Sequence, residues 1–180
     1  MKTIVIIITI LNFAIFIIGA FTVFSKPSSG EKPRSYTSSV ILCCMIYLLY
    51  LAAITEAIPS HNMILGLLLS LFSVCLFYYT ARSIQKGQLS PICSSDKPSF
   101  IVFQGPYQLV RHPFYTSYIM GFLAASLYTN SLLAIPAVMI IYLVYLRASE
   151  QEEFKFFESE LKDDYLNYMQ RVGRFFPRLF

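Results

Sequence analysis

Two short polar segments in an otherwise apolar sequence contain the side chains best suited to bind a charged ligand. The first, residues 105–115, includes Arg111 and His112, which can both donate hydrogen bonds to a carboxylate. The second includes the adjacent carboxylates Glu152 and Glu153, which can accept hydrogen bonds from ammonium or hydroxyl groups. Together they suit a zwitterionic ligand with hydroxyl groups, although ion pairs that only stabilise the structure would use the same residue types.

Long apolar runs flank these polar segments and must position them. Residues 3–24 and 62–81 are uncharged, and residues 38–58 contain one charge, Glu56. About 20 apolar residues suffice for a helix to cross the hydrocarbon core of a bilayer. Two shorter runs, 114–128 and 132–146, follow the polar loop 82–112 and are separated by a three-residue turn. We therefore expect about five transmembrane helices.

The basic residues indicate how these helices are oriented. Five spans leave one basic residue, Lys2, on the side of the N-terminus. The opposite side receives all the others: Lys26, Lys32, Arg34, Arg82, Lys86, Lys97, Arg111, Arg147, Lys155, Lys162, Arg171, Arg174 and Arg178. Because basic residues are enriched in cytoplasmic loops, this predicts an outside N-terminus and a cytoplasmic C-terminus.

The last two spans form a hairpin, which brings the polar segments together. The first segment ends where the run 114–128 begins, and the second begins where the run 132–146 ends. We therefore expect Arg111 and His112 to lie near Glu150, Glu152 and Glu153. Pro113 is well placed in the first turn of its helix, whose N-terminus adds partial positive charge.

The C-terminal tail carries a helical pattern. Apolar residues recur at steps of three and four over 149–172, which predicts one amphipathic helix on the cytoplasmic side. Gly173 is a plausible stop signal. Such a helix can lie on the membrane surface or close a site from below. The expected fold class is therefore all-α: a polytopic membrane protein with about five transmembrane helices plus a cytoplasmic amphipathic C-terminal helix.

The composition agrees with this organisation. Of 180 residues, 56% are hydrophobic and 13% charged, against roughly 45–50% and about 25% in soluble domains. We expect one domain over 1–180, made of three N-terminal spans (1–81), a cytoplasmic loop (82–112), a helical hairpin (113–147) and a tail (148–180). Four cysteines and two histidines show no metal-ligand spacing, so we expect neither a metal nor, given the modest net charge, a nucleic acid partner.

Both polar segments resemble the superfamily of isoprenylcysteine carboxyl methyltransferases and phospholipid methyltransferases. Residues 105–115 read G-P-Y-Q-L-V-R-H-P-F-Y, and a helical hairpin separates them from the E-E pair at 152–153. Two tyrosines and G-R-F-F-P at 173–177 then follow. The resemblance covers about residues 82–180. Its members are integral membrane enzymes that use S-adenosylmethionine.

The resemblance implies a role for each of several residues. Those expected to bind S-adenosylmethionine are Tyr107, Arg111, His112, Pro113, Tyr115, Glu152 and Glu153. Arg147 is a candidate catalytic residue that orients the acceptor or the cofactor carboxylate, and a snorkelling interfacial arginine is its structural alternative. His112 is the other candidate catalytic residue, as a base for a protonated acceptor. Since no G-x-G-x-x-G run is present, a Rossmann-type methyltransferase is excluded.

The resemblance leaves the acceptor open. We expect a lipid-like or apolar acceptor in the bilayer, and O-methylation of an isoprenylcysteine-type carboxylate is the first expected reaction. Phospholipid N-methylation and thiol or phenol methylation are alternatives. Outside the methyltransferases, an NADPH-dependent membrane reductase and a non-catalytic membrane protein also remain. The oligomeric state and the role of Glu56 are not indicated by the sequence.

Overall fold

A computed structural model describes residues 2–23, 60–84, 98–128 and 134–178. This part of the chain is all-helical, with five α-helices and one short 3₁₀ helix, and contains no strand. The second expected span (38–58, with Glu56) and the 129–131 turn lie outside these residues. The all-α class is thus confirmed for the described residues.

The two N-terminal helices follow the apolar runs closely. Helix α1 covers Lys2–Val23 and α3 covers Ser60–Arg82, against predicted runs of 3–24 and 62–81. One helix in the described residues, over Asn62–Arg82, is long and apolar enough to cross a membrane, and the apolar helix over Thr3–Gly19 is shorter. By length and composition α3 is therefore a candidate spanning helix, and the complete five-span topology stays a prediction.

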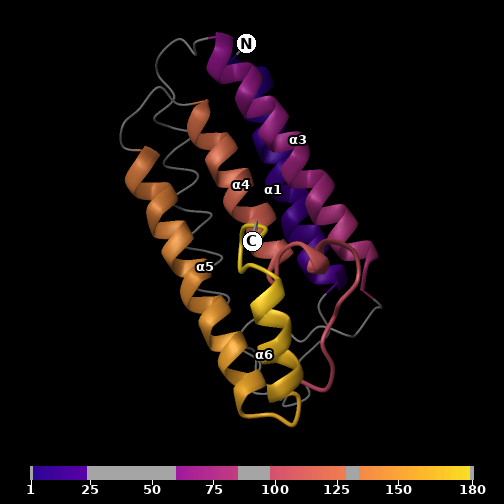
Figure 1. The fold of residues 1–180 in the computed structure, drawn as a ribbon. Coiled ribbons are helices and arrows are strands. Elements are labelled where there is room, and N and C mark those ends of the chain that lie inside the picture. Colours follow the sequence, from indigo (N-terminus) through magenta and orange to yellow (C-terminus); the bar gives the residue numbers. More distant parts are fainter. Residues whose placement is uncertain (1, 24–59, 85–97, 129–133, 179–180) are drawn as a thin grey trace.

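Helix α4, Pro113–Leu127, packs most extensively against α3 (Figure 1). The hydroxyl of Ser73 on α3 donates to the backbone carbonyl of Ser117 on α4 at 2.7 Å. Aromatic side chains fill the interface, where Phe77 lies edge-on to Phe114 with ring centroids 5.3 Å apart. This core fixes the N-terminal end of α4, directly after Arg111 and His112.

Helix α5, Ala134–Phe157, runs beside α4 and continues past the apolar run (Figure 1). The expected boundary between residues 147 and 148 is therefore wrong, because one helix carries both the apolar run and the glutamate pair. No helix breaker occurs there, and Arg147 pairs with Glu150 one turn later at 3.1 Å.

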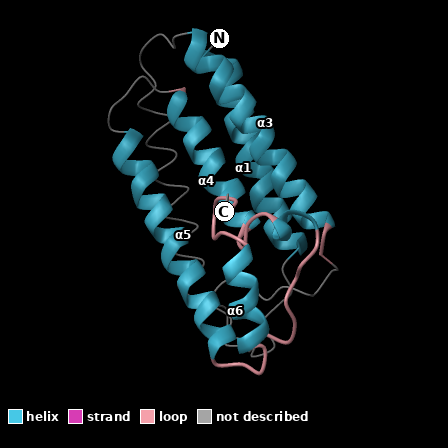
Figure 2. Cartoon of the chain, in the orientation of Figure 1, coloured by secondary structure: helices cyan, strands magenta, loops and turns pink. Residues whose placement is uncertain are grey.

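The predicted single helix over 149–172 is also wrong: α5 ends at Phe157 and a separate helix, α6, covers Lys162–Arg171 (Figure 2). The hydroxyl of Ser159 donates to the Phe156 carbonyl at 2.8 Å and accepts the Leu161 N–H at 3.2 Å. Such local bonds compete with helix continuation. The chain turns back between α5 and α6, and apolar side chains of the predicted stripe still contact one another across this turn. The rings of Phe156 and Tyr165 stack with centroids 4.1 Å apart.

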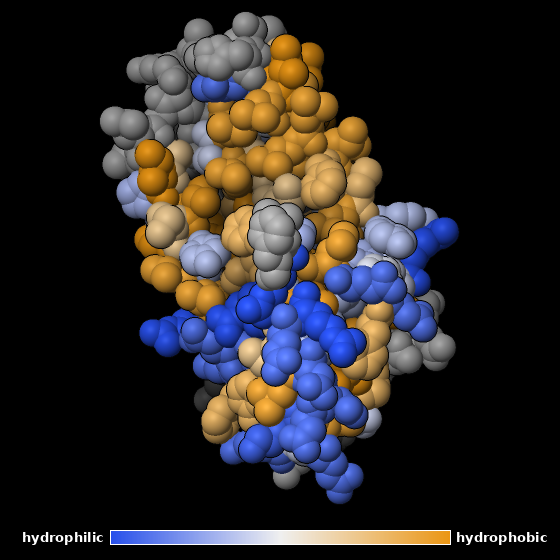
Figure 3. Space-filling model, in the orientation of Figure 1, coloured by the Kyte–Doolittle hydropathy of each residue, from blue (hydrophilic) through white to orange (hydrophobic). Residues whose placement is uncertain are grey.

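Polar and apolar surfaces separate along the molecule. Hydrophobic residues dominate the end formed by α1 and α3, whereas hydrophilic residues gather around α6 and the tail (Figure 3). The first polar segment ends at His112, directly before the N-terminus of α4, where it meets the glutamates of α5.

Candidate active site

The backbone before α4 is held in place by the C-terminal tail. After the 3₁₀ helix Gly105–Gln108, Val110 forms a parallel β-bridge with Gly173. The Arg111 N–H donates to the Gly173 carbonyl at 2.8 Å, and the His112 N–H donates to the Arg174 carbonyl at 3.1 Å. The first polar segment and the tail therefore form one structural unit.

Glu153 is the centre of the site. Its side chain is only 3% exposed, yet Arg111, His112 and Arg174 surround it. Arg111 Nη2 lies 2.9 Å, and His112 Nε2 3.1 Å, from Glu153 Oε1. Arg174 Nη2 donates to Glu153 Oε2 at 2.6 Å. A buried carboxylate needs such partners, since burying an unpaired charge is costly.

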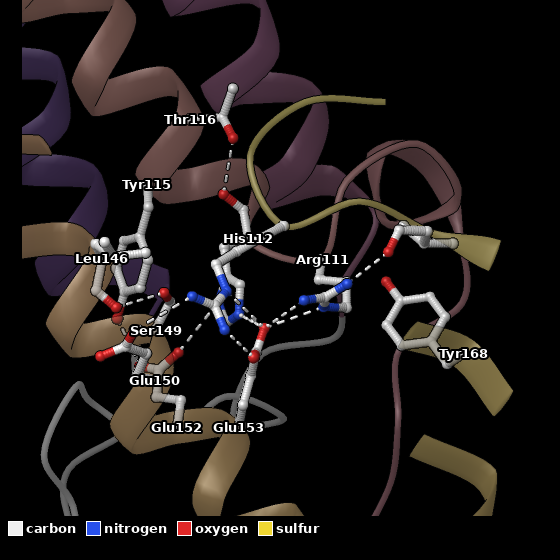
Figure 4. A network of polar contacts seen from close by, with 12 residues as sticks. Arg111, His112, Tyr115, Thr116, Leu146, Ser149, Glu150, Glu152, Glu153 and Tyr168 are labelled. Atoms are coloured by element: carbon white, nitrogen blue, oxygen red, sulfur yellow. Dashed lines mark hydrogen bonds and ion pairs between the residues drawn. The ribbon is translucent and has the colours of Figure 1, made fainter. Parts of the chain in front are cut away.

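Glu152 lies beside Glu153 and is more accessible, with 29% of its side chain exposed. The Tyr115 hydroxyl donates to Glu152 Oε1 at 2.5 Å. His112 Nδ1 lies 3.4 Å from Glu152 Oε2, so the imidazole sits between the two glutamates (Figure 4). Because both ring nitrogens face carboxylate oxygens, the doubly protonated imidazolium fits this position.

The pKa values of the two buried partners follow from this arrangement. Burial alone would raise the pKa of Glu153, but hydrogen bonds from His112 and Arg174 outweigh it and lower that pKa from 4.5 to about 2. Burial alone would lower the pKa of His112, but hydrogen bonds to Glu152 and Glu153 outweigh it and raise that pKa above 6.5. The Glu153 carboxylate is therefore ionised near neutral pH, and the two glutamates favour the protonated form of the His112 imidazole.

The other residues expected to line the site lie around this cluster. The Tyr115 ring stacks on His112, with centroids 5.5 Å apart and planes 3° apart. Pro113 is a buried first-turn residue of α4. Tyr107 is buried in the 3₁₀ helix, and its backbone carbonyl accepts the Tyr168 hydroxyl at 2.5 Å. Burial raises the pKa of the Tyr168 phenol, which keeps its hydroxyl protonated as a donor.

Arg147 is placed differently from the other predicted residues. Its side chain is 82% exposed and its Nη1 lies 3.1 Å from Glu150 Oε2 on the same helix. The structure brings Arg111, His112, Tyr115, Glu152 and Glu153 into one contact network, and Arg147 reaches it only through Glu150.

Arg174 belongs to the network but was not among the predicted site residues. The G-R-F-F-P stretch at 173–177 was the sequence signal that could have identified it, because Arg174 is the arginine of that motif. Gly173 next to it allows a tight turn: an added Cβ would overlap the backbone carbonyl of Phe176. Sequence spacing alone does not show that this turn folds back onto residues 110–112.

The residue types in the network fit S-adenosylmethionine. The guanidinium groups of Arg111 and Arg174 are of the type that binds the carboxylate of such a cofactor. The accessible oxygens of Glu150 and Glu152 can accept hydrogen bonds from its ammonium group or its ribose hydroxyls. In the described part of the chain, no group of three or more His, Cys, Asp or Glu side chains is arranged to hold a metal ion.

The helical fold holds this charged network at the N-terminal end of α4, which packs against α3, a helix long and apolar enough to cross a membrane. The model of the phospholipid methyltransferase family matches residues 61–163, which include α4, α5 and all but the first residue of α3. They also include Arg111, His112, Glu152 and Glu153. The chain belongs to the phospholipid methyltransferase family, and the resemblance seen in the sequence is confirmed.

A curated relative is also similar over part of its length. The cobalt-zinc-cadmium resistance protein CzcN of Cupriavidus metallidurans is 31% identical over 86 residues, which are 48% of this chain. The matched region spans 39% of that relative's length.

Proposed function

We propose that this protein binds S-adenosylmethionine at the Arg111–His112–Glu152–Glu153 network and transfers its methyl group to a lipid-like acceptor. The observation that carries the proposal is the contact of Arg111 and His112 with the glutamate pair, 2.9 Å and 3.1 Å from Glu153 Oε1, in a chain of a methyltransferase family. Methyl transfer from a sulfonium requires alignment of the reactants but no covalent enzyme intermediate.

The residues of the site have separate tasks in this proposal. Glu152, the more accessible glutamate, accepts hydrogen bonds from the cofactor, while Glu153 keeps Arg111 and His112 in place. Tyr107, Pro113 and Tyr115 contribute apolar walls that exclude water. When bound, the cofactor supplies a methyl group already activated by its sulfonium, so the chain's main task is orientation.

Neither candidate catalytic residue is assigned a proton-transfer step. Nδ1 of His112 lies 3.4 Å from Glu152 Oε2 and Nε2 lies 3.1 Å from Glu153 Oε1, so both ring nitrogens are engaged by the glutamates and we assign His112 to cofactor positioning. Arg147, with its guanidinium 82% exposed, is the candidate that orients an acidic acceptor such as a carboxylate or phosphate. A neutral amine acceptor would need no such partner.

The acceptor is proposed to enter from the bilayer. The site lies where the hydrophobic and hydrophilic surfaces meet (Figure 3), which suits a molecule with an apolar tail and a polar reacting group. Isoprenylcysteine-type carboxylates and phospholipid amines both have this form, and thiol or phenolic lipids share it. Product formation on a panel of these lipids, with radiolabelled methyl donor, distinguishes them.

The proposed topology has five spans, an outside N-terminus and a cytoplasmic site. A cysteine introduced at Glu160, in the exposed turn between α5 and α6, tests it in a variant whose four native cysteines are replaced. An impermeant thiol reagent should label this cysteine only after the membrane is opened. Labelling of intact cells would place the tail outside and contradict the topology.

The function is tested by cofactor binding to the full-length protein in lipid nanodiscs. Wild-type protein should bind S-adenosylmethionine saturably, and Glu152→Gln should weaken binding at least roughly tenfold, as expected for a lost charge-assisted hydrogen bond. Glu158→Gln, an exposed glutamate beyond the end of α5, is the matched control and should bind normally.

Two results would contradict the proposal. Folded wild-type protein that binds NADPH but not S-adenosylmethionine would be a reductase, and one that binds neither would be a non-catalytic member of the fold. Equal affinity in wild type and Glu152→Gln would remove the glutamate pair from the cofactor site.

A further inference from the structure

Two guanidinium groups contact Glu153, and they differ in how completely they are engaged. Arg111 is 8% exposed and uses all three of its side-chain nitrogens. Its Nε and Nη2 lie 3.0 and 2.9 Å from Glu153 Oε1, and its Nη1 donates to the Val172 carbonyl at 2.6 Å. A new anionic ligand could reach Arg111 only after these contacts break.

Arg174 is more accessible, with 27% of its side chain exposed. Its Nη2 and Nε contact Glu153 at 2.6 and 3.2 Å. Its Nη1 lies 3.6 Å from Glu150 Oε1, which is an ion pair but too long for a good hydrogen bond. The outer edge of this guanidinium therefore has donor capacity for a second carboxylate.

The two glutamates beside Arg174 keep other cationic partners when an anion binds to the outer edge of its guanidinium. Glu150 keeps Arg147, whose Nη1 is 3.1 Å from its other oxygen. Glu153 keeps Arg111 and His112. Because the backbone carbonyl of Arg174 also accepts the His112 N–H at 3.1 Å, the base of the arginine side chain is fixed beside the site.

We propose that Arg174 binds the carboxylate of the methyl donor, in exchange for Glu150, and that Arg111 is a positioning residue that holds Glu153. This inference rests on the proposed function and assigns a residue within it. Arg174 lies beyond the residues matched by the family, 61–163, so the assignment comes from its contacts alone. It also revises the expectation that Arg111 binds the cofactor directly.

Pairing each arginine variant with two ligands that differ by one carboxylate tests the assignment. The ligands are S-adenosylmethionine and decarboxylated S-adenosylmethionine, and the readout is the dissociation constant of each for nanodisc-embedded, full-length protein. In Arg174→Gln, affinity for S-adenosylmethionine should fall roughly tenfold or more, while that for the decarboxylated ligand changes less than about twofold.

Two further variants separate binding from positioning. Arg111→Gln should weaken both ligands by the same factor, because it disturbs Glu153 rather than one ligand group. Arg178→Gln is the control: this exposed tail arginine donates to the Met169 and Gln170 carbonyls at 3.3 and 2.7 Å, and both affinities should stay unchanged. Arg174→Lys keeps the charge without the fork and should give a smaller but still carboxylate-selective loss.

The outcomes separate this inference from the proposed function. Equal weakening of both ligands in Arg174→Gln, or a carboxylate-selective loss in Arg111→Gln, would overturn the assignment while leaving cofactor binding intact. Wild-type protein that binds neither ligand would overturn the proposed function itself. Should Arg174→Gln not fold, the selectivity of Arg174→Lys decides: a loss shared equally by both ligands refutes the assignment.

Discussion

Arg111 Nη2 lies 2.9 Å from Glu153 Oε1, although 42 residues separate the two in sequence. This contact joins the turn before α4 to the last turns of α5. A buried ion pair contributes little net stability compared with apolar packing, but removal of one partner leaves the other charge uncompensated. The pair is therefore expected to specify how the two helix ends meet.

The first prediction concerns this pair. Glu153→Gln should lower the free energy of unfolding by about 3–5 kcal/mol, because Arg111 would stay buried without a counter-charge. Unfolding by denaturant in a mild detergent measures it. The exposed Glu158→Gln is the control and should change stability by less than about 0.5 kcal/mol. Equal stability of the two variants would mean that Arg111 finds another partner.

The second prediction is a pH dependence. The pKa of His112 is raised above 6.5 in the folded protein, so its stabilisation is complete below that value and is lost as pH rises through the raised pKa. The pKa of Glu153 is lowered from 4.5 to about 2, so its stabilisation is present above 4.5 and is lost as pH falls toward about 2. The two contributions overlap between these limits.

Melting temperature measured across this range tests the sign. The wild type should be most stable between pH 4.5 and 6.5 with respect to these two groups, and its stability should decline at higher pH. In His112→Gln the decline above pH 6.5 should be smaller, because no proton is lost there. A variant that declines as steeply as the wild type would show that another group titrates.

The sequence was informative wherever the structure is local. The apolar runs predicted α1 and α3 to within about two residues, because a helix in lipid must satisfy its own backbone. The hairpin argument predicted that Arg111 and His112 meet the glutamates, since chain order alone places the two helix ends together. Both expectations used information within one or two neighbouring elements.

The sequence was less informative where distant segments compete or pair. The stripe over 149–172 was consistent with one helix, yet the bonds of Ser159 and the stacking of Phe156 on Tyr165 stabilise a reversal. Arg174 was not predicted as a site residue because its position depends on the bridge between Val110 and Gly173. No periodicity encodes a pairing between residues so far apart.

The third prediction concerns the turn that begins the 3₁₀ helix. Gly105 has φ of 58°, and an added Cβ would overlap the side chain of Ser83, the residue that follows the end of α3. Gly105→Ala should destabilise the protein by about 1–3 kcal/mol. The double variant Ser83→Ala/Gly105→Ala removes the overlap with the Ser83 hydroxyl but leaves the Cβ of residue 83 at 2.8 Å and the backbone strain, so it should recover only part of the loss. Full recovery would show that neither the backbone strain nor the remaining Cβ contact contributes.

The fourth prediction concerns the tail turn. An added Cβ on Gly173 would overlap the Phe176 backbone carbonyl, so Gly173→Ala should displace the tail from residues 110–112. Arg174 would move with it, and cofactor affinity should fall roughly tenfold. Limited proteolysis and ligand binding measure the two effects. Asn167→Ala, at an exposed position of α6, should leave both unchanged, and an unaltered Gly173→Ala would refute the role of the tail.

The last prediction separates the orientation of Glu152 from the stability of the fold. The Tyr115 hydroxyl donates to Glu152 Oε1 at 2.5 Å, and the ring of Tyr115 packs between His112 and Tyr145. Tyr115→Phe keeps the ring but removes the donor, which should cost about 1–2 kcal/mol of stability because Glu152 retains access to water.

Cofactor binding should respond more specifically than stability to this change. Without the hydroxyl, Glu152 is held only by His112 at 3.4 Å, so the dissociation constant of S-adenosylmethionine should rise roughly threefold to tenfold. Tyr79→Phe removes a hydroxyl from an exposed tyrosine of α3 and should leave binding unchanged. If Tyr115→Phe binds as tightly as Tyr79→Phe, the position of Glu152 does not depend on Tyr115, and the glutamate must be oriented by His112 alone.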